Sequence, residues 1–199
     1  MRLLVKPGSQ FPVDAEVESS GKVAGIYDKG KAALVVLEME TRLKGQADPL
    51  FVNRFSLFLR GEGGFGGDSG PAAGNTPPDR APDKVVESPT LPQQALLYRL
   101  SGDKNPLHAD PGFAKMGGFD VPILHGLCSF GIVCKAVVDN ALGGDTSKVA
   151  RYQARFAGVF FPAETMVTSY WQDGKTILVE SKSKERGTPV ISNAAITIR

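Results

Sequence analysis

A chain of 199 residues with 42% apolar side chains can bury a substantial core, in one large domain or two small ones. Its 23 Lys and Arg against 21 Asp and Glu leave a formal charge of +2, so there is no general electrostatic reason to bind nucleic acid or a membrane surface. No apolar run reaches the roughly 20 residues that span a bilayer, and the opening MRLLVKPGSQFP is too soon broken by proline to be a signal peptide. These features predict an intracellular protein.

The first sixty residues contain three predicted strands, over 15–27, 31–43 and 50–60, and no convincing helix. Asp28-Lys29-Gly30 is typical of the turn between the first two. The next segment, 61–84, has seven glycines and four prolines among 24 residues and is predicted to be a linker, because this composition does not support a packed element.

Beyond the linker the pattern changes to helix followed by strands. LPQQALLYRL favours a short helix, and a long apolar helix is predicted between Pro122 and Leu142, ended by Gly143 and Gly144. From Leu127 to Val138 its polar side chains are only Ser129 and Lys135, which predicts burial on most sides. Cys128 and Cys134 in this helix fit neither a redox pair nor a metal knuckle, and we expect reduced packing thiols.

Four further strands are predicted after the long helix, with Asp173-Gly174 as the hairpin turn between the second and third. An antiparallel sheet wrapped around one long helix is the hot-dog arrangement, an α+β fold. The predicted domains are a partial N-terminal hot-dog over 1–60, the linker 61–84 and a complete C-terminal hot-dog over 85–199. The four strands are 150–158, 164–172, 175–184 and 189–198.

The stretch SGDKNPLH places Asp103, Asn105 and one of only two histidines, His108, around a tight turn. Asn105 before Pro106 is a helix-start signal, because the Asn side chain caps free amides and proline has no amide to cap. A carboxylate and an imidazole brought to one water could transfer protons to and from carbon. The same residues could instead cap the turn while His108 packs in a polar crevice, and their spacing leaves both interpretations open.

The second histidine, His125, precedes Gly126 at the start of the long helix, where backbone amides have no partners within the helix. The Gly126 amide could therefore stabilise a carbonyl oxygen that gains negative charge. Alternatively, Gly126 only permits tight packing against the sheet. For His125 the residues favour a structural role, and its position next to Gly126 also makes it a candidate substrate contact.

The run YRLSGDKNPLHADPGFAKMGGFDVPILHGLCSFG strongly resembles the signature of the MaoC-like dehydratases, in particular the (R)-specific enoyl-CoA hydratase 2 group. NRFSLFLRGEGGFGG is similar to the end of the first half of two-domain members, so the resemblance spans nearly the whole chain. It implies reversible syn addition of water to a trans-2-enoyl-CoA, giving an (R)-3-hydroxyacyl-CoA, with no metal and no redox cofactor.

The resemblance also implies a role for each candidate residue. Asp103 and His108 would hold and activate the water, and Asn105 would orient the site. The Gly126 amide would polarise the thioester carbonyl. Lys29 would contact the coenzyme A portion and Phe156 would lie beside the acyl pocket; without the resemblance, a solvated lysine and an ordinary core phenylalanine would be expected.

Two-domain members carry further chain before the position that matches residue 1, including a helix cradled by their first sheet. We therefore expect the first sheet here to expose apolar surface, and predict self-association as a homo-oligomer, most simply a dimer. The residues expected to need burial are MRLLV, Leu34, Val36, Phe55 and Leu57.

Two alternatives remain from the sequence: a hot-dog thioesterase, and a non-catalytic acyl-CoA binding subunit. The ordered D-x-N-P-L-H turn favours hydration over thioester hydrolysis. The C-terminus ITIR is not the S-K-L type of peroxisomal address. The resemblance nonetheless suggests a peroxisomal setting in a eukaryote, and a cytoplasmic one otherwise.

Overall fold

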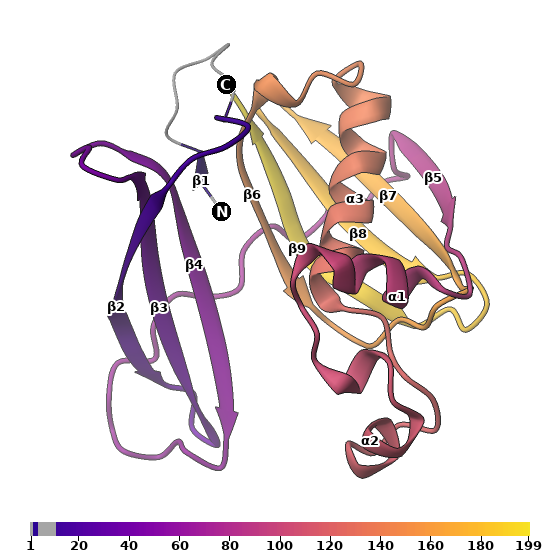
Figure 1. Cartoon of the computed structure of the whole chain (residues 1–199), viewed down its shortest axis with the longest axis horizontal. Coiled ribbons are helices and arrows are strands. Elements are labelled where there is room, and N and C mark those ends of the chain that lie inside the picture. Colours follow the sequence, from indigo (N-terminus) through magenta and orange to yellow (C-terminus); the bar gives the residue numbers. More distant parts are fainter. Residues whose placement is uncertain (1, 4–10) are drawn as a thin grey trace. The chain divides into compact units, whose positions relative to one another are not determined.

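The computed structural model of the chain describes residues 2–3 and 11–199, and it divides into two compact units (Figure 1). The first comprises the chain up to Gly74 together with Ser147–Arg151 and Arg199. The second comprises Asn75–Thr146 and Tyr152–Ile198. Among the described residues, no helix is both long and apolar enough to cross a membrane.

The first unit is an antiparallel sheet of three long strands, β2 (Val17–Asp28), β3 (Ala32–Leu43) and β4 (Pro49–Arg60). The short strand β1 (Arg2–Leu3) pairs with β4. Gly30, with a φ of 78°, makes the predicted turn between β2 and β3, a conformation that glycine adopts without steric cost. The described residues before the linker contain no helix, as the sequence predicted.

The two faces of this sheet differ in chemistry, because side chains alternate along each strand and paired residues share a face. On one face, Val23 pairs with Leu37, which pairs with Phe55. On the opposite face Glu38 forms ion pairs with Lys22 and Arg54, which hold the pKa of its carboxyl below the usual value. The apolar face consists mainly of Val17, Val23, Ile26, Ala33, Val35, Leu37, Met39, Leu43, Phe51, Phe55, Leu57 and Leu59.

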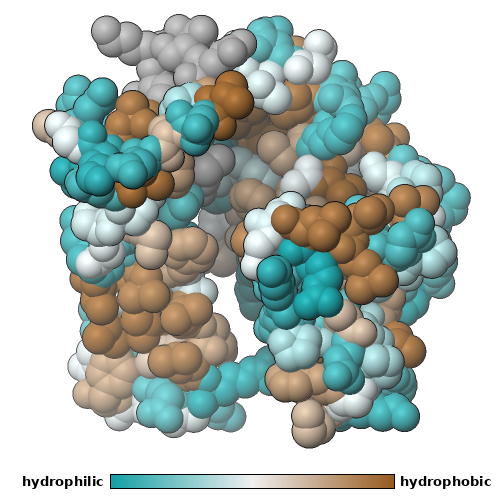
Figure 2. All heavy atoms as spheres, viewed as in Figure 1, coloured by the Kyte–Doolittle hydropathy of each residue, from teal (hydrophilic) through white to brown (hydrophobic). Residues whose placement is uncertain are grey.

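The register corrects one detail of the sequence interpretation. Leu34 and Val36 pair with Phe58 and Ser56, so they lie on the face opposite to Phe55 and Leu57 and do not share one apolar surface with them. Phe55 and Leu57 are exposed within the chain, as expected, and Figure 2 shows hydrophobic side chains gathered over β2–β4. Of MRLLV, residues 1, 4 and 5 lie outside the described residues.

The second unit contains an antiparallel sheet in the order β6-β9-β8-β7-β5, with β6 belonging to this unit from Tyr152 onward. In β8, buried Ile177, Val179 and Ser181 alternate with more exposed positions, as expected for a sheet with one face against a core. Gly174, with a φ of 56°, forms the predicted hairpin turn between β7 and β8. The strands are β5 (Lys84–Pro89), β6 (Val149–Phe156), β7 (Thr165–Asp173), β8 (Thr176–Ser183) and β9 (Pro189–Ile198).

The long helix α3 (Gly126–Ala141) lies across this sheet and contacts β5, β7 and β9 (Figure 1), which confirms the predicted hot-dog arrangement. Val133 and Val137 are fully buried in the contact. The helix ends as predicted, with Gly143 and Gly144 at positive φ and the Gly144 amide donating to the carbonyl of Val138.

One side of α3 is exposed within the chain. Leu127, Gly131 and Lys135 are exposed within the chain, and their spacing of four residues places them on one side of the helix. Buried residues, among them Cys128, Val133 and Val137, occupy the side that faces the sheet. The prediction of burial on most sides therefore holds, and the exception is this one stripe.

Short elements complete the unit. The short helix predicted in LPQQALLYRL is present as α1 (Gln94–Tyr98), and the 3-10 turn η1 (Arg99–Ser101) continues it. Strand β5 and helix α2 (Pro111–Met116) were not predicted. Residues 61–83 contain no helix or strand, although the Asn75 side chain donates a hydrogen bond to the carbonyl of Asn193.

Both cysteines are free, as predicted. Cys128 is buried and Cys134 is half-buried on α3. Burial raises the pKa of each thiol, because a thiolate would lose its hydration there. Both therefore stay protonated and act as packing groups.

Truncating the core of the second unit should destabilise it far more than truncating its surface. Ile177 is 1% exposed, and Ile177→Ala should lower the free energy of unfolding by about 2–5 kcal/mol, because it removes buried methyl groups and leaves a cavity. Leu100, 82% exposed, is the control, and Leu100→Ala should change stability by less than about 0.5 kcal/mol. Urea unfolding followed by circular dichroism measures both, and equal losses would contradict the assigned core.

Candidate functional site

The SGDKNPLH segment forms a tight turn between η1 and a second 3-10 turn, η2 (Pro106–His108). Gly102, with a φ of 115°, ends η1 and reverses the chain into Asp103. The Asp103 carboxylate accepts a hydrogen bond of 3.2 Å from the Asn105 amide, and the Asn105 side chain accepts one of 3.0 Å from the Leu107 amide. The predicted helix start at Asn105 is therefore confirmed, and this local network sets the direction of the Asp103 side chain.

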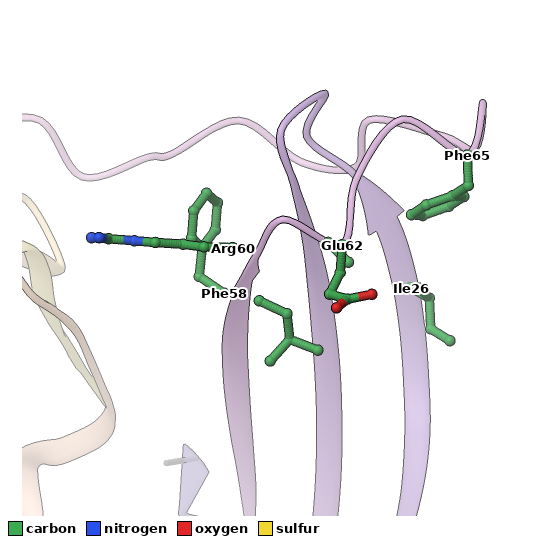
Figure 3. A pocket seen from close by; sticks show the side chains of 7 residues that line it. Ile26, Phe58, Arg60, Glu62 and Phe65 are labelled. Atoms are coloured by element: carbon green, nitrogen blue, oxygen red, sulfur yellow. The ribbon is translucent and has the colours of Figure 1, made fainter.

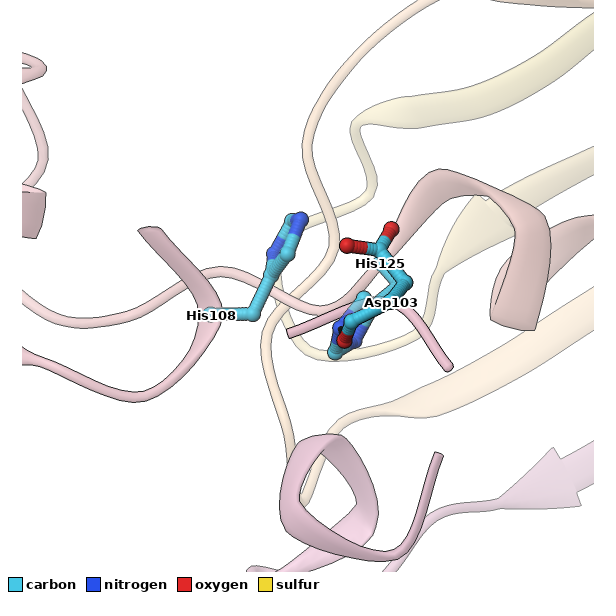
Figure 4. Close-up of side chains that lie close together, drawn as sticks. All are labelled: Asp103, His108 and His125. Atoms are coloured by element: carbon cyan, nitrogen blue, oxygen red, sulfur yellow. Dashed lines mark hydrogen bonds between the residues drawn. The ribbon is translucent and has the colours of Figure 1, made fainter. Parts of the chain in front are cut away.

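His108, at the end of η2, is oriented by a main-chain oxygen. Its Nδ1 lies 2.8 Å from the carbonyl oxygen of Ile123, a distance at which Nδ1–H donates and Nε2 keeps its lone pair. The Asp103 carboxylate and the His108 ring face each other in Figure 4. An oxygen of Asp103 and ring nitrogens of His108 and His125 all lie within 4.8 Å of one another. One water can bridge such a carboxylate and imidazole, so the predicted pair is brought together.

His125 is the third member of this cluster and the residue immediately before α3. It is 1% exposed, and its ring stacks on that of His108 with 3.8 Å between centroids and 29° between planes. Its Nε2 lies 3.1 Å from the main-chain oxygen of Asp103. Burial, above all, lowers the pKa of His125. This burial favours the structural role considered for His125 over a direct contact with substrate.

Two histidines and an aspartate are also a donor set that transition metals accept. The two rings here are stacked, however, so their in-plane lone pairs lie side by side and do not converge on one tetrahedral centre. His108 would have to leave the stack to share a metal ion with His125. The arrangement therefore fits proton transfer better than a metal centre.

Gly126 and Phe156, two further predicted residues, lie in contact. A Cβ added at Gly126 would come within 3.3 Å of the Phe156 ring, so a larger residue would push the ring aside. Gly126 is the first residue of α3, and no acceptor for its amide is found among the described residues. Phe156 is 51% exposed, and the centroid of its ring lies 6.4 Å from that of the Phe130 ring on α3. An exposed amide at a helix start, beside an aromatic wall, can receive a polarised carbonyl oxygen.

Lys29 belongs to the first unit. Its ammonium donates a 3.2 Å hydrogen bond to the carbonyl of Pro71 and is exposed. The neighbouring Asp28 carboxylate accepts from the amides of Gly30, Gly64 and Gly66, which hold the pKa of Asp28 below its usual value. Sequence reasoning missed this anchor; the signal was GEGGFGG, whose glycines leave amides free to converge on one carboxylate.

The surface has two hollows near some of the residues described above, and neither is lined by Asp103 or His108. One of about 710 Å³ lies in the first unit, at the end of its sheet (Figure 3). It is lined by Ile26, Ala33, Phe58, Leu59, Arg60, Glu62 and Phe65. The other, of about 510 Å³, adjoins η2 and is lined by Arg99, Pro106, Ala109, Asp110 and Pro111.

Comparison with protein families identifies the segment that carries this site. Residues 73–194 match the MaoC like domain, and residues 3–61 match the MFE-2 hydratase 2 N-terminal domain. The chain belongs to the MaoC-like domain family. The resemblance predicted from SGDKNPLH is thus confirmed, and with it the hot-dog fold class.

Relatives of this MaoC-like chain share well over a third of its residues. It is 45% identical over 187 residues to enoyl-CoA hydratase ChsH3 of Mycobacterium tuberculosis, covering 94% of this chain and 65% of that protein. It is 43% identical over 192 residues to the protein named enoyl-CoA hydratase 2, peroxisomal, of Arabidopsis thaliana, covering 92% of this chain and 62% of that one.

The solved structure of full-length peroxisomal multifunctional enzyme type 2 from Drosophila melanogaster is also similar. It matches with a TM-score of 0.87 and 33% identity, over 100% of this chain and 36% of that chain. The MaoC-like chain therefore spans about two thirds or less of the length of each of these proteins.

The Asn105 cap can be tested without any assay of activity. Asn105→Ala should lower the free energy of unfolding by about 0.5–2 kcal/mol, because the Leu107 amide loses its acceptor. Asn105→Asp keeps an acceptor at the same position and should lose less than Asn105→Ala. Chemical denaturation of both variants measures the difference, and equal stabilities would show that the side chain does not cap η2.

Proposed function

We propose that this MaoC-like chain is an (R)-specific enoyl-CoA hydratase. It would reversibly add water in syn fashion to a trans-2-enoyl-CoA and give an (R)-3-hydroxyacyl-CoA. The observation that carries the proposal is the facing pair of the Asp103 carboxylate and the His108 imidazole, close enough for one water to bridge them. The names of the relatives support the same activity.

In the proposed reaction the water oxygen bonds to C3 while a proton is delivered to C2 and the C2–C3 π bond is lost. Asp103 and His108 hold the water, take one of its protons as its oxygen bonds to C3, and deliver one proton to C2. Asn105 fixes the turn that aims the carboxylate. The free Gly126 amide donates to the thioester oxygen, which gains negative charge as C3 is attacked. Because no change of oxidation level occurs, we propose that the reaction uses no redox cofactor. Because the stacked imidazoles do not converge on one centre, we propose that it uses no metal.

The remaining predicted contacts belong to the same proposal. Phe156 would line the acyl site next to Gly126, and Lys29 would contact the coenzyme A portion of the substrate through its exposed ammonium. In a eukaryotic cell we expect the chain to act in peroxisomes, as the name of the Arabidopsis relative suggests, and otherwise in the cytoplasm.

The catalytic pair can be tested by replacing each member. Asp103→Asn and His108→Ala should each lower kcat for hydration of crotonyl-CoA by at least about 100-fold, because each removes a proton-transfer group. Loss of enoyl absorbance, with chiral analysis of the product, measures activity and stereochemistry together.

Asp110→Asn is the matched control for the carboxylate. Asp110 caps α2 through the amides of Gly112 and Phe113, and asparagine keeps that cap, so this variant should retain wild-type activity. Release of free thiol without loss of enoyl absorbance would indicate a thioesterase instead. Tight binding of enoyl-CoA by a wild-type chain with no turnover would indicate a binding subunit.

We also propose that the chain self-associates, with a second copy packed on the apolar face of β2–β4. The three strands each have 12 residues, so the face measures about 40 Å by 15 Å in projection. Because side chains make the real surface larger than its projection, the area of this face approaches the value of about 800 Å² per partner that is typical of a stable interface. The face lacks the Lys22–Glu38–Arg54 ion pairs of the opposite side, and its carboxylate, Asp28, lies at the end of β2. Two copies can therefore pack as a sheet sandwich with charge confined to the edge.

Adjacent residues of β4 provide a matched test of self-association. Leu57→Lys places a charge on the apolar face and should convert dimer to monomer at micromolar concentration, measured by sedimentation velocity. Ser56→Lys places the same charge on the opposite face, next in sequence, and should leave the dimer intact. A monomeric wild-type chain, or equal effects of the two substitutions, would refute this interface.

A further inference from the structure

His125 is tied to both members of the Asp103–His108 pair, although its own side chain is closed off from solvent. It occupies the cap position before α3 but makes no side-chain cap bond there. Its Nε2 instead forms a hydrogen bond with the main-chain oxygen of Asp103, and the face of its ring stacks on the ring of His108. Tyr98 contacts the His125 ring at a tilt, with 4.8 Å between centroids.

The bond to Asp103 restrains a segment whose other hydrogen bonds include the local ones around Asn105 and a 3.3 Å bond from the Arg99 guanidinium to the carbonyl of Lys104. Residues 102–105 lie between two short 3-10 turns and belong to no helix or strand, and the Asp103 side chain is exposed. The carbonyl oxygen of Asp103 can only accept, so the His125 Nε2 at 3.1 Å must carry the proton. Donation from a buried ring fixes the main chain from which the carboxylate projects.

The stack on His108 restrains the other partner. His108 is held at one edge by the carbonyl of Ile123 and on one face by the His125 ring. Together these contacts leave the Nε2 edge of His108 free to face Asp103 (Figure 4). Burial lowers the pKa of His125 and outweighs Asp103, which raises it; the nearby charges of His108 and Arg99 act in the same direction as burial and favour the neutral ring. A neutral ring can remain stacked while His108 gains and loses a proton.

Stability alone does not account for a histidine at this position. The Nδ1 of His125 is buried, and it has no hydrogen-bond partner among the described residues. An unsatisfied buried polar atom costs as much as or more than one ordinary hydrogen bond contributes, so the bond from Nε2 does not by itself offset it. A phenylalanine would fill the same space without that cost. The feature that phenylalanine would lack is the donor to Asp103.

We propose that His125 is a positioning residue, which aligns Asp103 through the donated hydrogen bond and His108 through the ring stack. The proposal rests on the function proposed for Asp103 and His108. It assigns to His125 no contact with substrate, in contrast to the substrate-binding role inferred from its place next to Gly126.

Two substitutions separate the two contacts. His125→Phe keeps a stacking ring and removes the donor, whereas His125→Gln keeps a donor and removes the ring. Each should lower kcat for enoyl-CoA hydration about 10- to 100-fold, because small misplacements of reacting groups cost this much. KM should change by less than about threefold, because neither variant removes a substrate contact. His125→Phe should melt at or above the wild-type temperature, because the unsatisfied Nδ1 is gone.

Thr168→Val is the matched control. Thr168 is fully buried on β7, and its hydroxyl is likewise without a partner among the described residues. Its replacement also removes an unsatisfied buried polar atom, so it should raise stability without changing kcat. If the His125 variants retain kcat within twofold of wild type, or lose kcat only with loss of fold, the proposal is overturned.

A second readout does not depend on activity. The chain has only two histidines, so 15N-histidine labelling gives an NMR spectrum with two imidazoles. In the wild type His108 should appear as one tautomer with the proton on Nδ1, facing the Ile123 carbonyl. In His125→Gln the loss of the stack should free the ring to leave that carbonyl, so that it averages between tautomers. Unchanged His108 signals in both variants would overturn the proposal. An inactive wild type would refute the proposed function, and the spectra would still decide whether His125 positions His108.

Discussion

The packing of α3 on its sheet is the constraint on which the rest of the second unit depends. Val133 and Val137 are fully buried against the strands, and this fixes where the helix begins as well as where it ends. Its first residue is Gly126, whose amide has no acceptor in the part of the chain that the structure describes. The residue before it, His125, contacts both His108 and the main chain of Asp103. The positions of Asp103, His108 and His125 thus follow from the burial of a helix in which none of these three residues lies.

Much of this could be predicted from local patterns. Asn105 before Pro106 identified a helix start, and the glycines after Leu142 identified a helix end, because both depend on backbone chemistry within a few residues. The alternation of β8 and the Asp173-Gly174 turn likewise predicted a hairpin. In contrast, β5 begins in a proline-rich segment with no strong period of its own, and it is a strand because β7 offers an edge to pair with.

The parts of the site that could not be predicted are those made by tertiary contacts. The spacing in the sequence places Asp103 near His108. The stack between His108 and His125, however, joins residues 17 apart, and it depends on the path by which residues 109–124 bring the chain back to His108. The face assignments in the first unit failed for a similar reason. Leu34 and Phe55 belong to separate strands, and only the register shows that they point to opposite sides. The anchoring of Gly64 and Gly66 by Asp28 also joins residues far apart in sequence.

Both imidazoles of the site are held by main-chain oxygens, those of Asp103 and Ile123. A carbonyl group is present whatever side chain its residue bears, so these two anchors are insensitive to the identity of the residues that provide them. Position 123 can therefore diverge among homologues, or be redesigned to reshape the surrounding surface, while the histidine it orients stays in place. The His108 side chain, which takes part in the proposed reaction, is thus held by a residue whose own side chain can change.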